Sequence, residues 1–139
     1  MEVGKAIYNI LSNDSDVAPL VTSGGITRIF PARFKFSQND PTLPFIVYQV
    51  VSDIPNNTKN GVSTYDYVTV QITLVHSKYS DLITLSGHVR DALDYVSGTF
   101  AGVVVDKIFF ENSVESFDDT SGTNGIYQIA QDYRFNINR

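Results

Sequence analysis

The chain begins with a helical pattern. Apolar residues recur at the i, i+3, i+4, i+7 and i+8 spacing that places them on one helix face, and the polar residues 13–15 follow. They are Val3, Ala6, Ile7, Ile10 and Leu11. A second short element at 17–21 leads into a Gly-containing turn at 22–25, after which the pattern predicts a strand at 26–31.

The middle of the chain has strand patterns. Residues 45–51 are apolar on both strand faces, which predicts a central strand covered on two sides. Residues 66–76 alternate between apolar and polar positions, as a half-buried strand does. The connection between them is polar and rich in Asn and Gly, so we expect a long antiparallel hairpin with a projecting tip.

A second helical pattern starts at Ser80, with apolar positions at Leu82, Leu85, Val89, Leu93 and Val96. Strands are predicted at 103–114 and 126–137, joined by an acidic, solvated linker at 115–124. The expected fold class is therefore α+β: a mostly antiparallel sheet of about five strands with two helices packed on it, in the order α-β-β-β-α-β-β. A chain of this length fits one domain, 1–139.

Composition and charge exclude several classes of function. Apolar residues make up 42% of the chain and charged residues 18%, which is typical of a globular protein. The formal charge of -5 argues against nonspecific nucleic-acid binding, and the absence of cysteine excludes disulfides and thiolate sites. With no secretory signal and no apolar run near the membrane-spanning length, we expect a soluble protein with no membrane partner.

The chain offers little catalytic chemistry. His88 and Asp91 could share a helix face, but two ligands do not define a metal site. Ser86 and His88 would diverge on a helix, and the glycines lack the spacing that holds phosphate. We therefore predict no catalytic residue, metal or cofactor, and keep a small enzyme or ligand-binding domain built on His88 and Asp91 as a less favoured alternative.

One loop carries a pattern typical of binding surfaces. Arg33, Phe34, Lys35 and Phe36 interleave basic and aromatic side chains within the predicted loop 33–44. Such a segment can contact an acidic protein face or stack on bases. Alternatively, its aromatic rings simply fold back onto the core.

Seven segments, in this order and spacing, resemble one known family. They are 16–21 (DVAPLV), 28–31 (RIFP), 43–48 (LPFIVY), 67–72 (YVTVQI), 89–93 (VRDAL), 125–127 (GIY) and 132–135 (DYRF). Together they span nearly the whole chain. The sequence resembles the small tail-completion proteins of long-tailed phages, also called tail terminators or tail-to-head joining proteins.

The resemblance implies a structural virion protein at the head-tail junction, made and assembled in the host cytoplasm. Such a subunit forms a ring with itself, commonly a hexamer, on the last ring of the tail-tube protein. The ring ends tube polymerisation and joins the head-completion or connector protein, without covalent chemistry. DNA would pass through its lumen without specific binding, which suits an acidic chain. The alternative is another neck component of related fold, either a head-closure or a minor tail protein.

In such a ring, we expect three segments to meet neighbouring rings: the loop 33–44, the hairpin tip 53–64 and the loop 115–124. The candidate protein-interface residues are Arg33, Phe34, Lys35, Phe36, Asn56, Asn57, Lys59, Asn60, Asp118 and Asp119.

Overall fold

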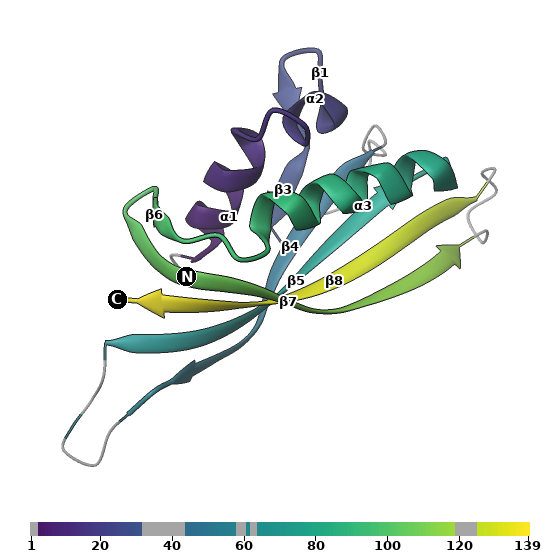
Figure 1. The fold of residues 1–139 in the computed structure, drawn as a ribbon. Helices are drawn as coiled ribbons and strands as arrows, with labels where there is room; N and C mark the ends of the chain where they lie inside the picture. The colour runs from purple at the N-terminus through teal and green to yellow at the C-terminus, as the bar shows by residue number, and fades with distance from the viewer. Residues whose placement is uncertain (1–2, 32–43, 58–60, 62–63, 119–124) are drawn as a thin grey trace.

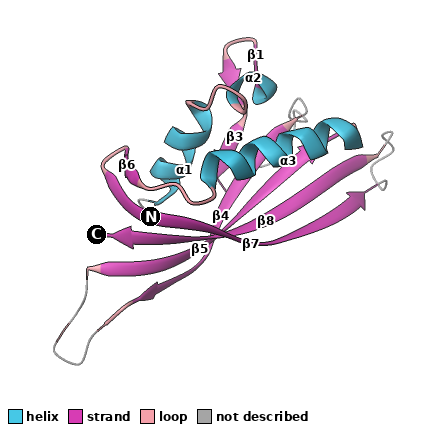
Figure 2. Cartoon of the chain, in the orientation of Figure 1, coloured by secondary structure: helices cyan, strands magenta, loops and turns pink. Residues whose placement is uncertain are grey.

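The computed structural model describes residues 3–31, 44–57, 61, 64–118 and 125–139. Its main layer is a six-stranded sheet in the order β3-β4-β5-β8-β7-β6, with the helices on one face (Figures 1 and 2). The strands of this sheet are β3 (Ile29–Pro31), β4 (Phe45–Pro55), β5 (Tyr65–His76), β6 (Gly98–Phe100), β7 (Val103–Asp118) and β8 (Ile126–Asn138). All neighbours pair antiparallel except β3 and β4, so the prediction of a mostly antiparallel α+β sheet is confirmed. The predicted count of about five strands and two helices, and their order, are wrong in detail, because the described residues form three helices, this six-stranded sheet and a separate two-stranded sheet.

Two amphipathic helices cover the sheet. In α1 (Val3–Ser12), all five apolar residues of the predicted stripe are buried. In α3 (Tyr79–Leu93), Leu82, Leu85, Val89 and Leu93 are buried. The alternate positions of β5 and β8 from Val68 to Leu74 and from Ile129 to Ile137 face these helices and complete the core. The apolar stripes of the two helices and the apolar positions of the strands therefore pack together on one face of the sheet.

The second helix ends earlier than predicted. It stops at Leu93, and Val96 lies beyond it. The chain leaves the helix because Asp94 is extended and Tyr95 has a φ of 63°, and because the Tyr95 amide donates to the Ile108 carbonyl (2.7 Å). Val96 still packs against the core from its position after the helix.

The single strand predicted at 26–31 is also wrong in detail. After α2 (Ala18–Val21), β1 (Thr22–Ser23) and β2 (Ile26–Thr27) form a separate two-stranded sheet, and only β3 joins the main sheet. The break falls at buried Arg28, whose Nε donates to the Pro44 carbonyl (3.0 Å) and whose guanidinium also donates to Ser23 Oγ. Through these two bonds, the Arg28 side chain connects the two-stranded sheet, at Ser23, to the segment before β4, at Pro44.

Three further expectations need correction. Residues 115–118 of the predicted linker belong to β7, which pairs with β8 as far as Asp118, and β6 was not predicted at all. The strand at 45–51 extends to Pro55 and is not covered on two sides along its length, since Val51 is 58% exposed. The helices lie on one face of the sheet, and this end of β4 projects beyond them (Figure 1).

Candidate interaction surfaces

The structure separates the predicted interface residues. Asn56 and Asn57 are exposed just beyond the end of β4, where the Asn56 amide donates to the Tyr65 carbonyl (2.8 Å). Asp118 is the last residue of β7, at the opposite end of the sheet. Arg33, Phe34, Lys35, Phe36, Lys59, Asn60 and Asp119 lie outside the described residues. The predicted set is therefore not brought together into one site by the residues that can be placed.

The outer edge of β7 is open over its second half. β6 pairs only with residues 103–105 of β7, and the segment after α3 then covers the next part of the edge. There the Ile108 amide donates to the Val96 carbonyl (3.1 Å), and the Phe110 amide donates to Asp94 Oδ1 (3.0 Å). From 111 to 118 no described residue bonds to this edge of the backbone, and residues 111–117 are all exposed. We call 111–118 the β7 free edge.

The described residues also leave part of the outer edge of β4 uncovered. β3 pairs with residues 46–48 of β4, and among the residues that can be placed none bonds to its outer backbone edge from 49 to 55. A bulge interrupts the pairing with β5 between Val50 and Ser52. Val51 and Ile54 are 58% and 59% exposed. We call 49–55 the β4 free edge.

Exposed apolar side chains also mark the end of β7. Val114 is 58% exposed and Phe117 is 52% exposed. The centroid of the Phe117 ring lies 4.7 Å from that of the Tyr127 ring. The Tyr127 centroid in turn lies 5.4 Å from that of the Tyr79 ring of α3. Because Tyr79 also donates to Glu115 Oε2 (2.9 Å), the helix holds this end of the sheet in a defined conformation.

The face of the sheet opposite the helices is polar with one aromatic cluster. The Arg134 guanidinium lies over the rings of Phe109 (4.8 Å) and Tyr67 (5.8 Å). Tyr65 donates to Asp106 Oδ2 (2.6 Å), and burial, followed by that hydrogen bond, raises the pKa of Tyr65 to about 12. These contacts fix side chains across β5, β8 and β7.

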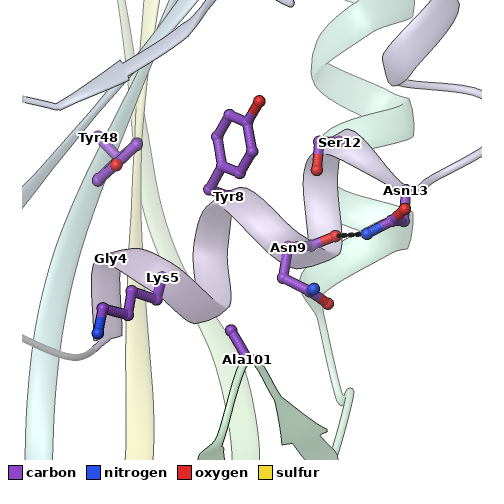
Figure 3. A pocket seen from close by; sticks show the side chains of 8 residues that line it. All are labelled: Gly4, Lys5, Tyr8, Asn9, Ser12, Asn13, Tyr48 and Ala101. Carbon is purple, nitrogen blue, oxygen red and sulfur yellow. Dashed lines mark hydrogen bonds between the residues drawn. The ribbon is translucent and has the colours of Figure 1, made fainter.

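A shallow hollow of about 470 Å³ lies beside α1 (Figure 3). Its lining residues are Gly4, Lys5, Tyr8, Asn9, Ser12, Asn13, Tyr48 and Ala101. This lining contains no carboxylate and no imidazole, and its titratable side chains are Lys5, Tyr8 and Tyr48. The hollow is a surface feature between a helix and the sheet.

The alternative site at His88 and Asp91 gains no support. Among the described residues, no group of three or more His, Asp or Glu side chains could hold a metal ion. The other histidine, His76, accepts a hydrogen bond at Nδ1 from the Lys78 amide (3.1 Å), and burial lowers its pKa. That contact gives His76 a structural role at the start of α3. In the part of the chain that can be described, no helix is long and apolar enough to cross a bilayer.

Sequence reasoning missed the two free edges. It placed Val51 in a central strand, Val114 in an ordinary strand and Phe117 in a linker. The one usable signal was the stretch 111–118, ENSVESFD, which puts charged or polar residues on both faces of a strand and so argues against burial.

Comparison with known proteins places the fold. A family profile described as tail completion protein gp17 matches residues 5–137. A chain from the structure described as "Virion of native gene transfer agent (GTA) particle" superposes with a TM-score of 0.71 and 15% sequence identity, over 99% of this chain and 95% of that chain. At that identity the likeness concerns the fold alone. No curated protein sequence matches.

Proposed function

The protein belongs to the gp17 tail-completion family, a family of phage structural proteins and not of enzymes, and on that premise we propose that it forms a ring that caps the tail tube. The ring ends polymerisation of the tail-tube protein and presents the surface that joins the head connector. Its place is then the head-tail junction of the virion.

The observation that carries this proposal is the pair of free edges. A ring with rotational symmetry needs two different patches on each subunit, because each copy contacts one neighbour with one patch and the other neighbour with the second. The β4 free edge and the β7 free edge are two such patches on opposite sides of one sheet. Family membership supports the position on the tail, and the edges support the ring.

The charge of the chain suits a ring through which DNA passes. The formal charge is -5, and the helix-free face of the sheet carries charges of both signs, among them Asp132 and Arg134 on β8. Because phosphates bind to clustered cations, a subunit of this kind would let DNA move without holding it.

The test is assembly. We expect native mass spectrometry over a concentration series, with electron microscopy of the products, to show a closed ring of one copy number. The same protein, added to purified tail tubes, should appear at one end of each tube and stop further addition of tube protein.

Two results would contradict the proposal. A protein that forms no ring in solution and does not bind tube ends is not a tail terminator. Binding to purified head connectors without binding to tubes would instead favour a head-closure protein of the same fold.

A further inference from the structure

We propose that neighbouring copies in the proposed ring are joined by backbone hydrogen bonds between the β4 free edge of one copy and the β7 free edge of the next. This inference rests on the proposed function. The interaction is β-sheet extension, in which an open strand edge adds a strand from a second chain. The partner is a second copy of this chain.

The directions of the two strands fit this pairing. From β4 to β7 the sheet runs through β5 and β8, and every step is antiparallel, so β4 and β7 run in opposite directions. When a second copy continues the sheet, its β4 lies antiparallel to the β7 of the first. The two edges also have nearly equal lengths, 49–55 and 111–118.

The side chains of the two edges fit an interface. Val51, Ile54, Val114 and Phe117 are each more than half exposed, between 52% and 59%. An open strand edge with apolar side chains is prone to uncontrolled association unless another strand covers it. Here both edges carry such side chains, so pairing them with each other covers both at once.

The two edges are offset along the sheet, and this offset decides how copies meet. Gln49 lies level with Gln71, Asp132 and Asn112 across the four strands. β3 covers β4 on one side of this level, and β6 covers β7 on the other side. Without a shift, the β4 free edge would face the part of the neighbour's β7 where Val96 and Asp94 already bond to Ile108 and Phe110. Pairing therefore requires a stagger along the strands.

The stagger gives a strand tilt like that of closed β-barrels. Ile54 lies five residues after Gln49, one of which is the extra residue of the bulge. Placing Ile54 opposite the neighbour's Asn112 or Val114 therefore shifts the copies by about four or six strand positions, roughly 13 or 20 Å. Over four strands about 19 Å wide, this shift tilts the strands by roughly 35 to 45°, which is the tilt of closed β-barrels.

Charge distinguishes these two registers. When Ile54 faces Val114, Asp53 faces Glu115, and directly opposed carboxylates are destabilising. When Ile54 faces Asn112, Asp53 faces Ser113. The second register keeps the acidic side chains apart, so we expect Ile54 opposite Asn112.

The chain has no cysteine, so disulfide cross-linking can test the pairing directly. Directly opposite strand residues have Cα atoms about 4.5 to 5.5 Å apart, within the range that a disulfide spans. We expect a variant with Ile54→Cys and Asn112→Cys to give, on oxidation of assembled rings, a ladder of covalent oligomers that ends at the ring's copy number. A variant with Ile54→Cys and Val114→Cys tests the other register.

The controls use the same exposed positions singly. Ile54→Cys alone and Val114→Cys alone should give no covalent dimer, because each faces the other edge and not itself. The matched control combines Ile54→Cys with Leu20→Cys, since Leu20 is 41% exposed on α2, outside the main sheet and both of its free edges. A ladder with this control, or a dimer from Val114→Cys alone, would overturn the edge pairing.

The outcome also separates this inference from the proposed function. Rings in solution or on tail tubes that give no ladder with either double variant would disprove the edge pairing and leave the ring standing. The absence of any ring under both conditions would remove the proposed function and this inference together.

Discussion

At the scale of single residues, one buried polar chain ties the sheet to a helix. Tyr133 is fully buried, and its hydroxyl donates to Gln131 Oε1 (2.8 Å). Gln131 Nε2 in turn donates to the Ser86 carbonyl of α3 (3.2 Å). Burial raises the pKa of Tyr133, so its hydroxyl remains a donor throughout the neutral and mildly alkaline range.

We expect Tyr133→Phe to lower the free energy of unfolding by about 1 to 3 kcal/mol, because it leaves the buried Gln131 oxygen without a donor. Chemical denaturation measures the change. Tyr127→Phe is the matched control, since no described residue bonds to its hydroxyl, and it should change stability much less. Equal losses of unfolding free energy from the two variants would show that the buried Tyr133 hydrogen bond contributes no stability of its own.

At the scale of elements, the two main helices differ in how closely they approach the sheet. Gly4 of α1 lies against Tyr48 of β4: a Cβ atom there would lie 3.1 Å from the ring carbon Cε2. Gly87 of α3 is exposed, and a Cβ atom there would have no neighbour within 4 Å. The absence of a side chain matters for packing in α1 and is only a helix-propensity cost in α3.

Gly87→Ala should therefore raise the free energy of unfolding by up to about 1 kcal/mol, the difference in helix propensity between the two residues. Gly4→Ala should give no such gain, because the new methyl group presses on the Tyr48 ring. Thermal and urea denaturation of both variants test this. A larger gain at Gly4 than at Gly87 would show that α1 is free to move away from the sheet.

At the scale of the whole molecule, helices cover one face of the sheet, and the described residues leave the β4 free edge and the β7 free edge without a strand partner. The helices pack on the face of the sheet and not along its edges. The short strands cover only part of each edge, β3 on the β4 side and β6 on the β7 side. The covered parts of the two edges lie at opposite ends of the strands, and the proposed edge pairing uses this arrangement.

Lysine on the free edges should prevent assembly without unfolding the subunit, since charged side chains at strand edges block edge pairing. We expect Ile54→Lys or Val114→Lys to reduce the ring population at least tenfold in native mass spectra. Their unfolding free energies should stay within about 0.5 kcal/mol of the parent, as for other surface changes. Leu20→Lys, on α2 and outside the main sheet, should leave ring formation unchanged, and a loss of rings there too would indicate a general effect of charge.

Much of the fold followed from local pattern. The apolar stripe from Val3 to Leu11 and the alternation from Asp66 to His76 each identify an element and its buried face, because a helix or strand repeats its geometry every few residues. The order and spacing of these elements also carried the resemblance to tail-completion proteins, which the family match bears out.

What depended on tertiary structure was everything set by contacts between distant segments. Whether Val51 or Val114 is core or surface depends on which strand lies beside it, and a strand pattern is the same at an edge as at the centre of a sheet. Arg28 split one predicted strand, and Tyr95 ended a helix, because each bonds to a residue far along the chain. The sequence alone therefore determined the main helices, the long strands and the family to which the chain belongs. Long-range contacts determined the short strands, the ends of the elements and which strand edges the described residues leave uncovered.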